Sequence, residues 1–75
     1  MTKEECLQII KERGYKTKIN FFGDRPAVPG DVLIREDAGK YVVVARDERC
    51  LEVEFSKKEF DNLSDALENF LSRLS

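Results

Sequence analysis

The end of the chain carries its clearest hydrophobic pattern. Between residues 60 and 74, apolar side chains recur at i, i+3, i+4, i+7, i+8 and i+11, and the positions between them are mostly polar. This spacing predicts an α-helix with one apolar stripe, formed by Leu63, Ala66, Leu67, Phe70, Leu71 and Leu74. Such a helix needs a surface to pack against, because an isolated amphipathic helix is marginal in water. Asp61 or Asn62 is its expected N-cap.

A second helix is predicted at the start of the chain. Thr2 and Glu5 have the spacing of a capping box, in which a Thr and a Glu three residues later bond each other's backbone N–H groups. Gly14 is the expected end of this helix, because glycine adopts the left-handed conformation found there. Tyr15 is expected to fold back against the apolar stripe, which consists of Cys6, Leu7, Ile9 and Ile10.

Between these helices, short β-type runs alternate with turn-forming residues. Strands are predicted over residues 18–22, 31–35, 40–46 and 50–55. A loop rich in Pro and Gly over residues 23–30 and hairpin turns over 36–39 and 47–49 separate them, and residues 56–60 lead to the last helix. The connections between the last three strands are too short for crossovers, so these strands should form an antiparallel meander.

The predicted architecture is α+β. Residues 1–75 form a single two-layer domain of order α-β-β-β-β-α, with an antiparallel sheet and both helices on one face. The strand at 40–46 is apolar on both faces and is therefore expected to be central. In the strand at 50–55 the side chains alternate. Those expected to face the helices are Leu51, Val53 and Phe55, and those expected on the open face are Cys50, Glu52 and Glu54.

The open face would also take one alternating set from the central strand. That set is either Tyr41, Val43 and Ala45 or Val42 and Val44. An apolar stripe flanked by carboxylates is typical of a protein-binding surface. The expected partner-binding residues are Tyr41, Asp47, Glu48, Glu52 and Glu54. Tyr41 would be the anchor, because tyrosine is enriched at interface hot spots.

Composition restricts the function. The chain has 75 residues, a net charge of −2 and both signs of charge spread along its length, which argues against direct binding of nucleic acid because that needs a concentrated basic patch. No apolar run approaches the roughly 20 residues that cross a bilayer, so no membrane partner is expected. The N-terminus lacks the apolar region of a signal peptide, which predicts a cytoplasmic protein.

Catalytic patterns are absent from the sequence. The chain contains no His, which excludes Ser-His and Cys-His nucleophile arrangements, and it has no P-loop or dinucleotide-binding glycine pattern. Cys6 and Cys50 lie far apart, and without His they do not form a zinc site. We expect both thiols to be reduced and largely buried. The sequence therefore predicts a protein that is not an enzyme and has no cofactor or metal.

Several short runs resemble a known family. They are Gly23-Asp24-Arg25, Gly39-Lys40-Tyr41-Val42-Val43, Asp47-Glu48-Arg49, and Phe60-Asp61 followed by Ala66-Leu67 and Phe70-Leu71. Together they are similar to small bacterial immunity proteins of polymorphic toxin systems, and most of all to the immunity protein 59 family. Members of that family often carry Gly after the Asp-Glu-Arg turn, where this chain has Cys50.

The resemblance implies a cytoplasmic antitoxin that binds a cognate toxin domain and blocks it without chemistry of its own. A mildly acidic surface agrees with this role, because acidic inhibitors associate rapidly with basic toxin domains. The alternative is a phage- or plasmid-encoded inhibitor of a host defence enzyme, similar to an anti-CRISPR protein. Two further readings are an assembly module, which would self-associate, and a small enzyme. We expect a monomer or a weak homodimer.

Overall fold

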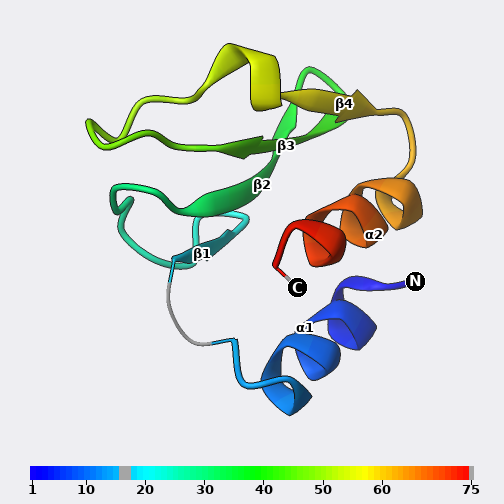
Figure 1. Ribbon diagram of the computed structural model, residues 1–75. Coiled ribbons are helices and arrows are strands. Elements are labelled where there is room, and N and C mark those ends of the chain that lie inside the picture. Colours follow the sequence, from blue (N-terminus) through cyan, green and yellow to red (C-terminus); the bar gives the residue numbers. More distant parts are fainter. Residues whose placement is uncertain (16–17, 75) are drawn as a thin grey trace.

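The structure, a computed structural model, describes residues 1–15 and 18–74 and confirms the α+β class and the predicted order of elements. The sheet has four strands in the order β1-β2-β3-β4. The described residues form two α-helices, four strands and one 3₁₀ turn, η1 (Figure 1): α1 (Lys3–Glu12), β1 (Ile19–Phe21), β2 (Val32–Asp37), β3 (Lys40–Ala45), η1 (Glu54–Ser56), β4 (Lys58–Phe60) and α2 (Leu63–Leu74).

The sheet is mixed, so the prediction of a purely antiparallel sheet is wrong. β2, β3 and β4 form the expected antiparallel meander, but β1 runs parallel to β2, with Ile19 opposite Val32. Parallel neighbours usually need a long crossover. Here β1 is so short that the loop over residues 22–31 returns along it without a helix. Asn20 fixes the start of this loop, because its side chain donates to the Arg25 carbonyl at 2.8 Å and accepts from the Gly23 N–H at 2.9 Å.

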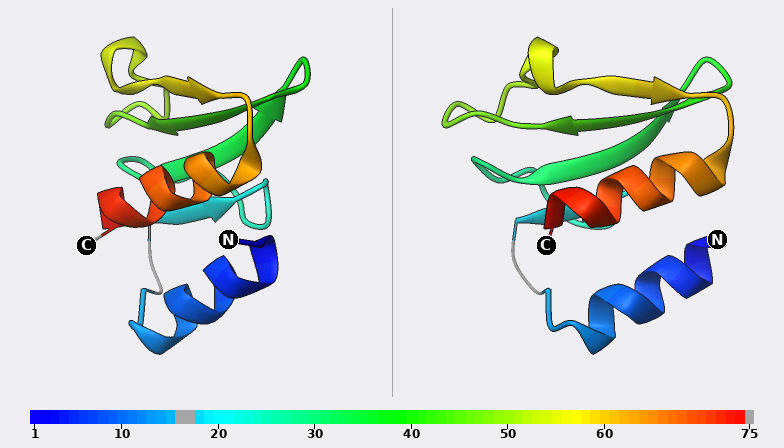
Figure 2. Two further views of the ribbon diagram at one scale, coloured as in Figure 1. Left: turned by 90° about the vertical axis from the view of Figure 1, so that its right-hand side faces the viewer. Right: turned by 45° about the vertical axis from the view of Figure 1, so that its right-hand side comes forward.

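Both helices begin where their capping residues predict. Thr2 and Glu5 form both bonds of the capping box, and the Asn62 side chain accepts from the Asp65 N–H at 2.8 Å. α2 lies across one face of the sheet and packs on β2, β3 and β4, whereas α1 packs beside α2 near the β1 edge (Figure 2). The two helices therefore share one core with the sheet, but only α2 covers the strands broadly. The buried α2 residues are Ala66, Leu67, Phe70 and Leu71.

The fourth strand lies later in the chain than predicted. Residues 50–55 make one isolated bridge, between Arg46 and Glu52, and the chain then turns through η1 before β4 begins at Lys58. The Ser56 hydroxyl accepts from the Ala45 N–H at 3.1 Å and donates to the Val53 carbonyl at 2.7 Å. The hydroxyl therefore lies between the Ala45 N–H and the Val53 carbonyl, which would otherwise bond each other. The reciprocal bond of this pair is present, because the Val53 N–H donates to the Ala45 carbonyl. The hydrogen-bond ladder between these two stretches of backbone is therefore interrupted at this point.

The sheet face away from α2 is not open. Val43 belongs to the core shared with the helices, and Tyr41 packs against that core. Val42 and Val44 point to the opposite face, where they form a second buried cluster with Leu33 at 2% exposure or less. η1 packs against β3. Of the two sets proposed for the open face, Val42 and Val44 is the one that points away from the helices, but the chain itself buries it.

Candidate protein-binding surface

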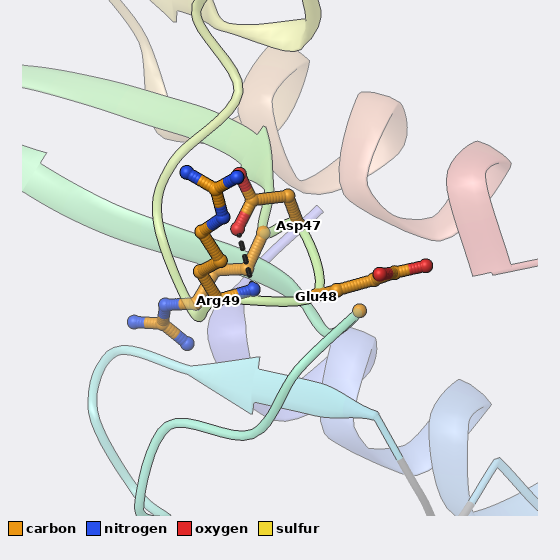
Figure 3. A pocket seen from close by; sticks show the side chains of 5 residues that line it. Asp47, Glu48 and Arg49 are labelled. Carbon is orange, nitrogen blue, oxygen red and sulfur yellow. Dashed lines mark hydrogen bonds between the residues drawn. The ribbon is translucent and has the colours of Figure 1, made fainter.

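The segment over residues 46–57, which joins β3 to β4, carries most of the predicted contact residues. Its turn is organised by Asp47, whose carboxylate accepts from the N–H groups of Arg49 at 2.8 Å and Leu51 at 3.1 Å. The Asp47 carbonyl accepts from Cys50 and from Gly30, which ties the turn to the loop before β2. Figure 3 shows Asp47 directed at the backbone of Arg49, whereas Glu48 extends away from both. Asp47 therefore shapes the turn and Glu48 faces outward.

A buried ion pair anchors the first residue of this segment. Asp31 is fully buried at the start of β2, and its carboxylate accepts from the Arg46 guanidinium and from the Val28 N–H. The Arg46 N–H in turn donates to the Asp31 carbonyl at 2.9 Å. Nothing in the sequence pattern indicates this pair, because Asp31 has the position of an ordinary residue between a loop and a strand.

Glu52 is engaged within the fold. Arg35 on β2 donates to both Glu52 carboxylate oxygens, at 2.8 and 2.9 Å, and also lies 3.4 Å from Asp37. Both side chains of the pair are 29% exposed. Hydrogen bonding from Arg35 lowers the pKa of Glu52 against the opposing effect of desolvation, and the same bond raises the pKa of Arg35. Glu52 therefore holds the segment to the sheet and has little capacity left for a partner.

The exposed apolar side chains of the segment are the feature that sequence reasoning placed wrongly. Leu51 is 57% exposed and Phe55 is 94% exposed, although alternation predicted both to face the helices. Phe55 lies in the middle of η1, and its neighbour Glu54 is exposed, with its carboxylate 3.9 Å from the Lys57 ammonium. Apart from Asp47, whose carboxylate is bonded within the turn, we call the exposed side chains of this segment the Phe55 surface: Glu48, Arg49, Leu51, Glu54 and Phe55.

The five predicted contact residues do not lie together. Asp47, Glu48, Glu52 and Glu54 share the 46–57 segment, and of these Glu48 and Glu54 have carboxylates directed to solvent and belong to the Phe55 surface. Tyr41 lies on β3 between Glu36 and Phe60, half-buried against the core beneath the helices. It belongs to the other side of the sheet from Val42.

The Phe55 surface has the features of a surface that contacts another protein. A hollow of about 600 Å³ beside it is lined by Gly30 and by the turn from Arg46 to Arg49, with two cations and two carboxylates (Figure 3). In the described ranges, no three residues of the His, Cys, Asp and Glu types come together as a metal site. Both cysteines are free: Cys6 is buried as expected, whereas Cys50 is only half-buried. Neither described helix has the length and apolar character needed to cross a membrane.

Comparison of the chain with protein-family models, with curated protein sequences and with solved structures finds no match.

Proposed function

We propose that this chain is a non-catalytic protein inhibitor, a cytoplasmic immunity protein that neutralises a cognate bacterial toxin by binding it directly. The observation that carries the proposal is the 94% exposure of Phe55. Large aromatic side chains in a small domain are usually drawn into the core. Here the Ser56 hydroxyl opens the strand ladder next to it and keeps Phe55 outside. A ring held in water by specific hydrogen bonds is typical of an interface anchor.

The surroundings of Phe55 suit a protein partner. Transfer of a phenylalanine side chain from water into a partner's pocket contributes about 1.5–3 kcal/mol, and Leu51 adds a smaller share. Glu48 and Glu54 are exposed carboxylates on the same segment, and their negative charge would attract a basic partner and speed association. Because Asp47, Arg46 and Glu52 are fixed by bonds within the chain, the segment is preorganised and little conformational entropy is lost on binding.

The backbone at Cys50 also supports the resemblance to immunity proteins. Cys50 follows the Asp47-Glu48-Arg49 turn and has a φ of +64°, in the left-handed region that glycine adopts without strain. The immunity protein 59 family often carries Gly at the corresponding position. This chain therefore departs from the family pattern at a position where its backbone conformation favours the glycine that the family carries.

The experiment that tests the proposal uses the gene adjacent to the one encoding this chain. Its product is expressed in a bacterial host alone and together with this chain, and growth is measured. We expect the neighbour to be toxic alone and harmless in the presence of this chain, and the two purified proteins to form a stoichiometric complex in calorimetry. A neighbour that is not toxic, or one that stays toxic and unbound when both are produced, would contradict the immunity function.

Variants then test the surface. Phe55→Ala should weaken the complex by at least tenfold, the range of a hot spot. Phe55→Leu, which keeps an apolar side chain, should retain most of the affinity, and Glu59→Ala on the neighbouring exposed position of β4 should leave it unchanged. If growth rescue is intact and Phe55→Ala binds as tightly as the unaltered chain, the inhibitor binds through a different surface.

A further inference from the structure

β4 is an edge strand of the sheet. It stands last in the strand order, and of the described strands only β3 pairs with it (Figure 1). The opposite edge, β1, is covered by the loop that follows it, because the Phe21 N–H donates to the Asp24 carboxylate at 2.9 Å. An exposed edge strand is a place where a further strand can pair. β4, on which Lys58 and Glu59 are exposed, is therefore the edge available for pairing.

Alternation along β3 shows which backbone groups of β4 are already bonded. The N–H and the carbonyl of Ala45 both bond the segment that leads to β4. Every second residue of a strand points the same way, so the backbone groups of Val43 and Tyr41 are also directed to β4. Their partners in the register are Lys58 and Phe60. The N–H and C=O groups of Lys58 and Phe60 therefore point inward, to β3.

The next backbone groups along β4 point outward, because the C=O and N–H of a trans peptide unit lie on opposite sides of the chain. They are the Lys57 carbonyl, the Glu59 N–H and carbonyl, and the Asp61 N–H. None of these groups takes part in a hydrogen bond within residues 1–15 and 18–74. The Lys57 N–H, in contrast, donates to the Glu54 carbonyl at 3.1 Å. Acceptors and donors thus alternate along the outer edge, as an antiparallel partner strand requires.

We propose that β4 pairs with β4 of a second copy of this chain, antiparallel and with Glu59 on the two-fold axis. The Glu59 N–H and carbonyl then bond the carbonyl and N–H of Glu59 in the second copy. The Asp61 N–H donates to the Lys57 carbonyl of the second copy, and the symmetry repeats this bond. Every outward backbone group of both strands is therefore satisfied. The two four-stranded sheets join into one continuous sheet, with α2 of both copies on the same face.

The side chains at the ends of this pairing are complementary in charge. Lys57 of one copy lies directly opposite Asp61 of the other, on the face away from α2, and directly opposite charges stabilise paired strands. Within one copy, the Asp61 carboxylate lies 3.6 Å from the Lys40 ammonium and the Lys57 ammonium lies 3.9 Å from the Glu54 carboxylate. Both separations are longer than a hydrogen bond. Lys57 and Asp61 therefore retain capacity for each other across the axis.

The positions between these ends select the register. On the face that carries α2, Lys58 lies opposite the half-buried ring of Phe60, and a lysine over an aromatic ring is favourable. An axis at Lys58 would leave the Glu59 carbonyl and the Asp61 N–H unbonded, because the Lys57 N–H is already engaged. An axis at Phe60 would place Glu59 opposite Asp61, a repulsive pair. Only the axis at Glu59 satisfies the backbone and pairs the end charges.

The dimer is expected to be weak. β4 has three residues, so the contact belongs to the small, transient class of interfaces. The two Glu59 carboxylates meet at the axis, and like charges directly opposite each other weaken the pairing further. We expect a Kd on the order of 0.1–1 mM, so the test covers concentrations from about 0.02 to 2 mM.

The test combines sedimentation equilibrium with NMR of the ¹⁵N-labelled chain over that range. We expect the mass to rise toward that of a dimer and the amide signals of Glu59 and Asp61 to shift with concentration. In a mixture of labelled and unlabelled chain, an intermolecular contact should appear between the Hα atoms of Lys58 and Phe60, which come close only in this register. A monomer at every concentration, or concentration-dependent shifts confined to residues away from β4, would overturn the proposal.

Matched variants at Glu59 separate the backbone from the charge. Glu59→Pro removes the outward N–H and leaves the inward bonds of Lys58 and Phe60, so the fold should persist. Because symmetry removes the bond twice, the dimer should weaken by about tenfold or more. Glu59→Ala keeps the N–H and removes the like charges, so the dimer should tighten by about two- to fivefold. A folded Glu59→Pro chain that associates as strongly as Glu59→Ala would refute pairing through β4.

A charge exchange tests the axis itself. An equimolar mixture of Glu59→Lys and the unaltered chain should form a mixed dimer in preference to either like pair, because opposite charges then meet at the axis. Random mixing of the two chains would contradict the register with Glu59 at the centre.

This inference goes beyond the proposed function, and the two can fail separately. The dimer is measured with the purified chain alone, whereas growth rescue requires the toxin. A chain that dimerises through β4 but rescues no growth would retain the pairing and lose the immunity function. Phe55→Ala should leave the concentration dependence unchanged. Loss of that dependence in Phe55→Ala, with the fold intact by its NMR spectrum, would assign self-association to the Phe55 surface and refute the pairing of β4.

Discussion

The exposure of Phe55 depends on one small group, the Ser56 hydroxyl. It connects the Ala45 N–H, at 3.1 Å, to the Val53 carbonyl, at 2.7 Å. Ser56→Ala removes both bonds while leaving the backbone free of new clashes. Each half-buried hydrogen bond contributes about 0.5–1.5 kcal/mol net, so the expected loss in free energy of unfolding is about 1–3 kcal/mol.

Two measurements check this expectation. Urea unfolding gives the loss in stability, and native-state hydrogen exchange reports on the Ala45 amide itself, which should be protected in the unaltered chain and exchange markedly faster in Ser56→Ala. Ser64→Ala serves as the matched control, because the Ser64 hydroxyl accepts only from the exposed N-terminus at 3.0 Å. Its effect should be within about 0.5 kcal/mol. A loss smaller than this in Ser56→Ala, together with unchanged exchange at Ala45, would refute the assignment of the opened ladder to the hydroxyl.

Four further predictions follow from burial, pKa and backbone conformation. Leu67→Ala should cost about 2–5 kcal/mol in urea unfolding, because Leu67 is fully buried where α2 meets the sheet; a neutral result would show that this packing is wrong. Glu52→Gln should destabilise by about 1–2 kcal/mol at pH 7. Because Arg35 lowers the folded-state pKa of Glu52, that difference should be complete above the unfolded value of about 4.3 and shrink as the pH falls through the folded-state pKa; a difference constant from pH 7 to pH 2 would count against it. Cys50→Gly should stabilise by up to about 1 kcal/mol through relief of the left-handed strain, whereas Cys50→Ala, which keeps the strain, should not. Burial raises the pKa of the Cys6 thiol to about 11, so a disulfide reagent at pH 8 should modify Cys50 in the folded chain and reach Cys6 only on unfolding; rapid reaction of both thiols would contradict the buried position of Cys6.

The elements that the sequence predicted well are those whose causes are local. The capping box at Thr2 and the stripe of α2 each depend on residues within a few positions of one another, and both are present in the structure. The turn between β2 and β3 is also local: Ala38 and Gly39 have φ values of +51° and +82°, which fit a two-residue hairpin. The α+β class followed from these elements, and the antiparallel pairing of β2 with β3 followed from the short turn between them.

The candidate site was only partly readable from the sequence. The carboxylates of the 46–57 segment pointed to the stretch of chain that carries the Phe55 surface proposed here, but not to the exposed apolar side chains within it. Strict alternation in residues 50–55 predicts extended backbone and says nothing about whether apolar surface is present on the other side to receive Leu51 and Phe55. The buried pair of Asp31 and Arg46 was missed because the two residues are far apart in sequence and ordinary in type.

By itself the sequence determined the two amphipathic helices and the hairpin turn between β2 and β3, because periodicity, capping and turn preferences act over a few neighbouring residues. Tertiary structure decided the direction of β1, the burial of Val42 and Val44, and the exposure of Phe55. A three-residue strand can pair in either direction, so its neighbours and its loop choose between them. Whether an apolar side chain is buried depends on what lies opposite it, and at residue 55 a hydrogen bond from Ala45 to Ser56, eleven residues apart, turns the backbone and leaves the ring in solvent.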